Sequence, residues 1–223
     1  MKSIAFFDVD YTLVAGNSGF YTSLNLVRHK ILKKRRMAQA VYYLLAATLF
    51  DQDVRKIYQI AVTDLAGCTL EHVLEIGRET FDAKVKPKIY TEGLSLVADH
   101  KKRGDAVVLL TSAPYMLIHS LQNYLKADEA YSMGPVIQNG ILTRDLALPI
   151  CHADGKIHYA KEASKKYGIP LSECFFYTDH HTDIPLLKLV GNSRVVNPGH
   201  RLEKEAIRRG WPMLRFRETL GKM

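Results

Sequence analysis

The feature that most constrains the fold is an apolar run near the N-terminus that leads directly into two carboxylates. Residues Ile4–Phe7 are all apolar, and Asp8, Asp10 and the hydroxyl of Thr12 follow. An apolar run without alternation is typical of a strand covered on both faces, as in a parallel sheet. Carboxylates just beyond such a strand lie at its C-terminal end, where open α/β sheets bind ligands. Because the two carboxylates repel each other, they indicate a compensating cation or a shared proton.

The second half of the chain alternates between short apolar strands and helices, which predicts a parallel α/β sheet. The pair Asn139-Gly140 is a turn signal that we expect to join two short strands. We expect strands over 106–110, 175–177 and 194–196, and helices over 92–103, 114–125 and 157–167.

Residues 20–83 have helical periodicity and no strand-like alternation. Apolar stripes over 24–31 and 41–48 indicate two helices, a third fits 54–65, and Thr69 opens a fourth. The simplest interpretation is a helical insertion after the first strand. We therefore predict a catalytic core over 1–15 and 88–223 and a helical cap domain over 16–87.

Composition and charge narrow the class of protein. The chain has 223 residues with 31 Lys and Arg against 23 Asp and Glu, a net charge of +8. This balance favours an anionic partner, either a phosphorylated metabolite, a nucleic acid or an acidic lipid headgroup. The three cysteines are not spaced as a metal or disulfide motif, so we expect reduced thiols. With no signal peptide and no apolar run of about 20 residues, we expect a cytoplasmic protein.

Polar groups follow the apolar strands at four places along the chain. Asp8 and Asp10 follow the first strand, Thr111-Ser112 follows the strand over 106–110, Lys156 opens a helix, and the segment Asp179–Asp183 follows the strand over 175–177. Because the ends of parallel strands meet at one crevice, we expect these groups to converge.

In this order the residues resemble the haloacid dehalogenase superfamily of phosphatases and phosphotransferases. Its pattern is DxDxT, a Thr or Ser after a strand, a Lys, and an acidic pair. The insertion resembles the C1-type cap of the phosphoserine phosphatase-like branch, subgroup IB. Further resemblance lies in residues 177–187, YTDHHTDIPLL, and in residues 195–198 and 209–212. The resemblance implies a Rossmann-like core with an inserted cap.

This resemblance also implies a reaction. Asp8 is then the nucleophile, which forms an aspartyl-phosphate that water hydrolyses. Asp10 protonates the leaving oxygen and later activates the water. Mg²⁺ is expected to be held by Asp8, the Asp10 backbone carbonyl and Asp179. Asp183 either binds the metal through water or orients its ligands, although an ordinary helix N-cap is the simpler explanation for this residue.

Thr111, the Ser112 amide and Lys156 are expected to hold the phosphoryl oxygens. Each has a simpler explanation when taken alone. Thr111 and Ser112 suit helix capping, and an exposed lysine is usually only solvated. Two observations favour an anion site at Lys156. The polar groups occur in the order of the family pattern, and a cation at the start of a helix opposes the helix dipole unless an anion is bound there.

The substrate is expected to be small and phosphorylated, and to differ from phosphoserine. Phosphoserine phosphatases carry a glutamate that pairs with the substrate amine, and here Asn17 occupies its place. Near the position of their cap arginine stand Tyr58 and, one turn earlier, Arg55. Tyr11 is bulkier than the residues usual at its position in the motif. We expect it to narrow the cleft or to contact the cap; the simpler alternative is that it only packs against neighbouring side chains.

His180 and His181 are adjacent in the loop between the two aspartates. A zinc site with His152 would need four convergent ligands, which adjacent side chains do not readily supply. We expect loop residues at the mouth of the site, with His180 as a substrate contact.

The expected cap also holds a basic run, KILKKRR at 30–36, followed by an apolar stretch over 37–50. A solvated turn before a buried helix is the simpler interpretation. An interfacial patch for anionic membranes is the alternative.

We therefore predict a Mg²⁺-dependent phosphatase that hydrolyses a phosphate monoester through phospho-Asp8. The alternatives are a phosphotransferase with the same intermediate, a lipid-phosphate phosphatase at the membrane surface and, last, a non-enzymatic protein that binds a phosphorylated ligand. No recognition helix or aromatic basic surface indicates nucleic acid. A monomer or a homodimer is expected.

Overall fold

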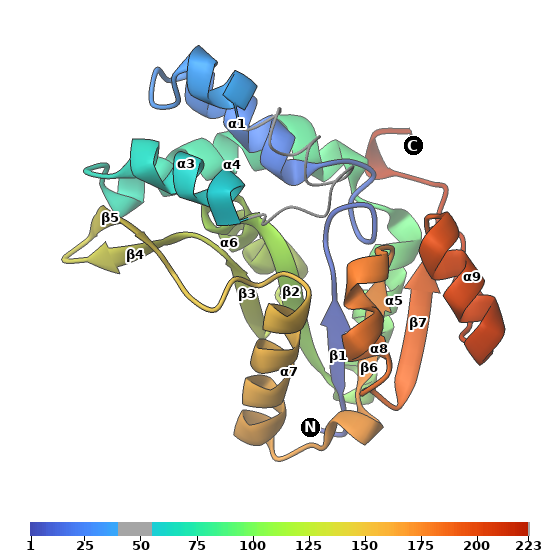
Figure 1. Ribbon diagram of the computed structural model, residues 1–223. Coiled ribbons are helices and arrows are strands. Elements are labelled where there is room, and N and C mark those ends of the chain that lie inside the picture. Colours follow the sequence, from blue (N-terminus) through green and yellow to red (C-terminus); the bar gives the residue numbers. More distant parts are fainter. Residues whose placement is uncertain (40–54, 223) are drawn as a thin grey trace.

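The computed structural model describes residues 1–39 and 55–222, and its centre is a parallel sheet of six strands (Figure 1). The strand order is β3-β2-β1-β6-β7-β8, with β1 in the middle. The strands are β1 (Ile4–Phe7), β2 (Ala106–Pro114), β3 (Glu129–Met133), β6 (Phe175–Thr178), β7 (Asn192–Val196) and β8 (Met213–Leu214). All neighbouring pairs are parallel, so the predicted α/β class is confirmed.

Helices cover both faces of this sheet, which explains why β1 and β2 carry no polar alternation. Side chains such as Phe7 and Leu109 pack with α5 (Thr91–Arg103) and α6 (Tyr115–Leu125) on one face. Their sequence neighbours Phe6 and Val108 pack on the other face. The helices there are α7 (Asp154–Tyr167), α8 (Ile184–Leu187) and α9 (His200–Arg209).

A second layer of helices lies over the C-terminal end of the sheet (Figure 1). It contains α1 (Ser18–Arg28), α3 (Arg55–Leu65) and α4 (Leu70–Thr80), and α4 continues into the turns Phe81–Val85 and Lys86–Lys88. Helix α4 lies directly against α6, because a Cβ on Gly77 would be 2.1 Å from the Met116 carbonyl oxygen. The helix predicted over 41–48 lies outside the described residues.

A hairpin from the second half of the chain joins this helical layer. Strands β4 (Pro135–Gln138) and β5 (Ile141–Leu146) are antiparallel, and Asn139-Gly140 forms the predicted turn with φ of 51° and 76°. The hairpin bonds to the loop between α3 and α4. The Gly67 amide donates to the Leu142 carbonyl at 2.9 Å, and the Leu142 amide donates to the Cys68 carbonyl at 3.0 Å.

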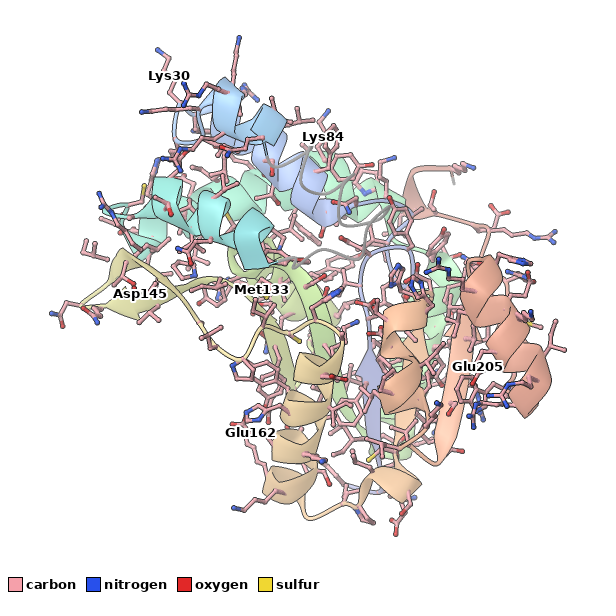
Figure 2. All side chains as sticks on the ribbon, viewed as in Figure 1. Lys30, Lys84, Met133, Asp145, Glu162 and Glu205 are labelled. Atoms are coloured by element: carbon pink, nitrogen blue, oxygen red, sulfur yellow. The ribbon has the colours of Figure 1, made fainter. Side chains whose placement is uncertain are left out.

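The expected basic run begins at the turn after α1, where Lys30 is exposed (Figure 2). Lys33, Lys34 and Arg35 are exposed as well, and Arg36 forms an ion pair of 3.2 Å with Asp64. Residues 40–50 of the apolar stretch that follows lie outside the described residues. No helix in the described ranges is long and apolar enough to cross a membrane.

Several elements differ from the sequence-based expectations. Strand β2 extends through Pro114, which caps α6 and does not lie in its first turn. Helix α7 begins at Asp154 and so places Lys156 inside its first turn. Strands β3 and β8 and helix α9 had no matching prediction. The remaining short helical turns are Leu171–Glu173, His181–Asp183 and Leu220–Lys222.

Candidate active site

Asp8 and Asp10 lie at the C-terminal end of the central strand. The Asp8 amide donates to the Tyr177 carbonyl at 2.9 Å, which extends the pairing of β1 with β6 by one residue. Asp8 is 8% exposed, and its Oδ1 accepts from the Val9 amide at 2.8 Å. Asp10 Oδ1 accepts from the Ser18 amide at 3.0 Å. Asp10 is therefore tied to the first turn of α1.

Lys156 lies opposite Asp8 as a buried cation. Its Nζ is 3.1 Å from Asp8 Oδ2 and 2.7 Å from Asp183 Oδ2, and the residue is 3% exposed. Burial lowers the pKa of Lys156, but the two carboxylates together outweigh that effect and raise it. The start of α7 sits close to the preceding loop, because a Cβ on Gly155 would be 1.7 Å from the Ile150 carbonyl oxygen. Only glycine fits there, one residue before Lys156.

Asp183 holds Lys156 in place through one of its two oxygens. Oδ2 accepts from Lys156 and also from Thr178 Oγ1 at 2.6 Å. The other oxygen, Oδ1, is buried and has no hydrogen-bond partner. Asp179 lies beside them and accepts from Thr12 Oγ1 at 3.2 Å. The hydroxyl of the DxDxT motif is thus directed at the second acidic pair.

Thr111 and Ser112 lie near the end of β2, next to these carboxylates along the sheet edge. Thr111 is buried, and its Oγ1 accepts from the Ala113 amide at 3.1 Å. This bond is local, as a turn-forming threonine would make. The Ser112 side chain hydrogen-bonds to the hydroxyl of Tyr58, which comes from α3 in the helical layer.

The site is rich in carboxylates and, among the described residues, Lys156 is the cation that contacts them. Burial raises the pKa of Asp10 to about 7. Burial, together with the charge of Asp8, raises the pKa of Asp179 to about 8. Burial likewise raises the pKa of Asp8. These raised pKa values indicate a shortage of positive charge around the carboxylates at the C-terminal end of the sheet.

The donors present suit Mg²⁺. Mg²⁺ prefers hard oxygen ligands and commonly uses only one or two carboxylates, with water in its other positions. Asp8 and Asp179 offer such oxygens, and the buried, unpartnered Oδ1 of Asp183 is consistent with a further polar group in the site. No group of three or more ligating side chains is placed to hold a metal within residues 1–39 and 55–222. That result gives no support to zinc at His152, His180 and His181.

The residues predicted to contact substrate have different surroundings. Tyr11 is 49% exposed, and its φ of 58° is a left-handed conformation that costs a non-glycine residue about 1–2 kcal/mol. Asn17 caps α1, because its Oδ1 accepts from the Phe20 amide at 2.7 Å. His180 Nδ1 lies 2.8 Å from Thr182 Oγ1, and burial beside His181 lowers the pKa of His180 to about 4. Arg55 is the first residue of α3.

A buried polar network supports the site from behind. The ring of Tyr177 stacks on Phe7 with centroids 4.5 Å apart, and its hydroxyl lies 2.8 Å from His100 Nε2. His100 Nδ1 in turn lies 2.8 Å from Asp105 Oδ2. Because the Tyr177 carbonyl also accepts a hydrogen bond from the Asp8 amide, this network fixes the backbone that carries Asp8.

Sequence reasoning gave no site role to three groups that the structure places here. Tyr58 was noted only for its position in the cap, and its contact with Ser112 depends on how the helical layer meets the sheet. Thr178 is the last residue of β6 and directly precedes Asp179, so a hydroxyl at the strand end was the available signal. Cys151 is buried near Lys156, and burial raises its pKa to about 12.

A comparison with known protein families shows to which family the chain belongs. A model of the haloacid dehalogenase-like hydrolases matches residues 5–188. The chain belongs to this hydrolase family. The hydrolase is 31% identical over 218 residues to a probable phosphatase from Mycobacterium tuberculosis, covering 96% of this chain and 76% of that protein. It is 28% identical to a histidinol-phosphatase from Neisseria meningitidis, over 97% of this chain and 100% of that protein.

Among solved structures, the hydrolase is similar to a substrate-bound phosphoserine phosphatase. The TM-score is 0.69 at 16% identity, over 96% of this chain and 93% of that one. At this identity the likeness concerns the fold. The expected kinship with phosphoserine phosphatase-like enzymes of this family, and the class of enzyme, a phosphatase, are confirmed.

Proposed function

We propose that this hydrolase is a Mg²⁺-dependent phosphatase that splits a small phosphate monoester through a covalent intermediate on Asp8. The observation that carries the proposal is the pairing of Asp8 with the buried Lys156, 3.1 Å apart, at the C-terminal end of the central strand. A carboxylate nucleophile next to a fixed cation suits attack on an anionic phosphoryl group.

In the first step an Asp8 carboxylate oxygen forms a bond to phosphorus, and the bond from phosphorus to the ester oxygen breaks. Asp10 gives its proton to the departing alcohol oxygen. The raised pKa of Asp10, about 7, suits a carboxyl that must carry a proton near neutral pH. In the second step Asp10 takes a proton from water. The water oxygen bonds to phosphorus, and the bond from phosphorus to Asp8 breaks.

The remaining groups hold the phosphoryl oxygens and the metal. Lys156, Thr111 and the Ser112 amide would bind the phosphoryl oxygens, and Asp183 keeps Lys156 directed at Asp8. Asp8, the Asp10 carbonyl and Asp179 would hold Mg²⁺. When bound, Mg²⁺ supplies the positive charge that offsets repulsion between the carboxylates and the phosphate.

The helical cap over 16–87 would close the site and contact the leaving group. Asn17 is uncharged and its side chain caps α1, so it offers no charge to a substrate amine. This supports a substrate other than phosphoserine. The family relative named for histidinol phosphate makes that ester a candidate to compare directly with phosphoserine. We expect the reaction to take place in the cytoplasm.

The test is a phosphate-release assay with Mg²⁺ and with EDTA. The esters would be p-nitrophenyl phosphate, sugar phosphates, phosphoserine and histidinol phosphate. We expect turnover that is lost in EDTA and lost by at least a thousandfold in Asp8→Asn. Asp145→Asn, on the hairpin (Figure 2), makes the same charge change at an exposed position and should keep full activity. Turnover in Asp8→Asn within tenfold of wild type would overturn the proposed intermediate.

A further inference from the structure

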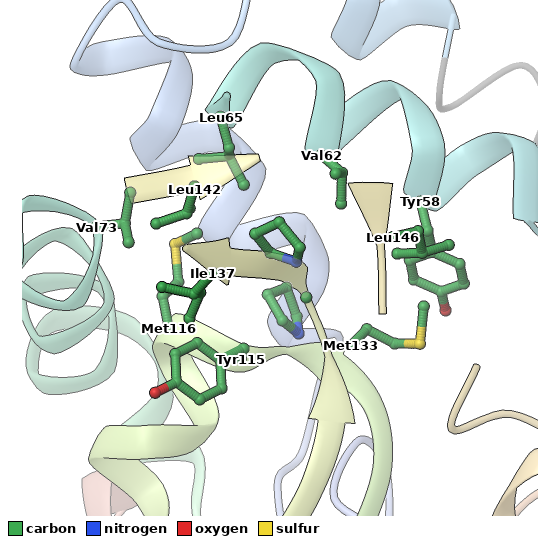
Figure 3. A pocket seen from close by; sticks show the side chains of 13 residues that line it. Tyr58, Val62, Leu65, Val73, Tyr115, Met116, Met133, Ile137, Leu142 and Leu146 are labelled. Carbon is green, nitrogen blue, oxygen red and sulfur yellow. The ribbon is translucent and has the colours of Figure 1, made fainter. Parts of the chain in front are cut away.

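An apolar cavity of about 60 Å³ lies between α3, α4, α6 and the β4–β5 hairpin (Figure 3). The side chains that line it are almost all hydrocarbon or aromatic. Val62 and Leu65 come from α3, Val73 from α4, Met116 from α6 and Leu142 from β5. All five are 5% exposed or less. Ile137 of β4 also lines it and is 37% exposed, so the cavity is an apolar space at the junction between the helical layer and the sheet that is exposed on the hairpin side.

The cavity lies close to the part of β2 that carries Ser112, because Pro114, two residues further along β2, is one of its lining residues. Tyr58 also lines the cavity and lies at one side of the lining residues in Figure 3, and its hydroxyl hydrogen-bonds to Ser112. Burial raises the pKa of Tyr58, and the charges of Asp10 and Asp8 raise it further, so this hydroxyl lies within electrostatic reach of both. Tyr58 thus contacts both the apolar cavity and Ser112 of the proposed phosphate site.

From Tyr58 the cavity extends along α3. Tyr58, Val62 and Leu65 are spaced four and three residues apart and so line one face of the helix. Seven residues of helix span about 10 Å. A group that enters beside Tyr58 would extend along α3 toward Leu65 and Val73.

We propose that this cavity receives the apolar end of the leaving group. The substrate is then a phosphate monoester of an alcohol that ends in a compact apolar group. An engineered cavity of about 150 Å³ binds benzene, so a space of about 60 Å³ accepts a group of about two to three carbon atoms. The inference rests on the proposed function, because it concerns the alcohol released from Asp8 chemistry.

The proposal predicts a dependence on chain length. Across straight-chain alkyl phosphates, kcat/KM should rise about threefold to fourfold for each methylene that enters the cavity. The rise should stop after two to three such carbons, because the cavity is then full. A terminal hydroxyl in place of the last methyl should remove the gain, since it would be buried among apolar side chains without a partner.

Two substitutions should move the point at which the rise stops. Val62→Phe fills the cavity and should end the rise earlier, whereas Leu142→Ala enlarges it and should extend the rise to longer chains. Leu26→Ala is the matched control, because Leu26 belongs to the same apolar cluster but does not line the cavity. It should lose stability and keep the wild-type profile. Thermal unfolding of each variant shows whether it is folded.

Binding of alkylphosphonates, measured by calorimetry, separates this proposal from the proposed function. Their carbon–phosphorus bond is not hydrolysed, so the chain-length series can be followed without turnover. If no ester is hydrolysed but phosphonate affinity rises and levels off, the function fails and the cavity proposal stands. If esters are hydrolysed and neither kcat/KM nor affinity depends on chain length in the wild type, the cavity proposal is wrong. The same holds if the profile shifts equally in Leu26→Ala.

Discussion

Replacing Asp183 with asparagine tests whether this carboxylate holds Lys156 in the site. The substitution keeps the size of the side chain and an acceptor oxygen for Thr178, but it removes one of two negative charges around a buried ammonium. Lys156 is 3% exposed, so water cannot take the place of the lost charge. We expect a folded but clearly less stable protein.

The magnitude follows from the distances. Two unit charges 2.7 Å apart attract by about 6 kcal/mol at an effective dielectric constant of about 20. Loss of the repulsion between Asp183 and Asp8, and the acceptor oxygen that asparagine keeps for Lys156 and Thr178, offset about half of this. The expected loss is about 3 kcal/mol, the lower end of the range for removing one partner of a buried ion pair. At this chain length that lowers Tm by roughly 6–12 °C.

The assay is thermal and chemical unfolding followed by circular dichroism, with the exposed Asp145→Asn as the control for a change in net charge. A double-mutant cycle with Lys156→Met isolates the pair. If Asp183 acts through Lys156, the two substitutions together should cost about 2 kcal/mol less than their sum. A Tm within about 1 °C of wild type, or a coupling energy below about 0.5 kcal/mol, would refute this reasoning.

Two further predictions concern the supports of the site. Gly77→Ala should lower stability by about 1–2 kcal/mol, although alanine favours a helix, because its Cβ would meet the Met116 carbonyl oxygen at 2.1 Å. Chemical unfolding measures this loss. The control is Gly199→Ala, where a Cβ would have nothing within 4 Å, and its free energy of unfolding should stay within about 1 kcal/mol of wild type. Equal losses in the two variants would contradict the close contact at Gly77. Burial lowers the pKa of His100 below the ordinary value of a histidine, so the unfolded state binds a proton that the folded state resists. The free energy of unfolding should be at its full value above pH about 6.5 and should fall as the pH drops below it. Chemical unfolding at pH 7.5 and 5.5 should show a larger loss in the wild type than in His100→Gln. An equal loss in both proteins would contradict this.

The central strand and its carboxylates could be predicted because their signal is local. Residues Ile4–Phe7 are apolar on both faces of the strand, and Asp8 follows directly. Consecutive residues therefore indicate both the burial of the strand and the position of the carboxylate. Lys156 could be placed at the start of a helix for the same reason. In such cases the sheet topology alone brings the groups to one edge.

Contacts between distant segments could not be predicted in this way. The pairing of Asp183 Oδ2 with Lys156 depends on how α7 packs against the sheet, and the contact of Tyr58 with Ser112 depends on where α3 lies. Asn17 illustrates a different limit. Its position in the family pattern predicts a place near the substrate, and its side chain caps α1, which is a role that asparagine before a helix predicts equally well.

The hairpin bears on how this enzyme could be recombined with its relatives. Its β5 strand exchanges backbone hydrogen bonds with Gly67 and Cys68, and the amide of Leu70 donates to the Gly140 carbonyl at 2.8 Å. A graft of residues 16–87 alone would therefore cut through a shared stretch of sheet-like pairing and leave those peptide groups facing a foreign surface. A chimera that carries 134–147 together with 16–87 keeps this seam intact. The transferable unit is thus assembled from two stretches of chain, and its seams are set by backbone pairing.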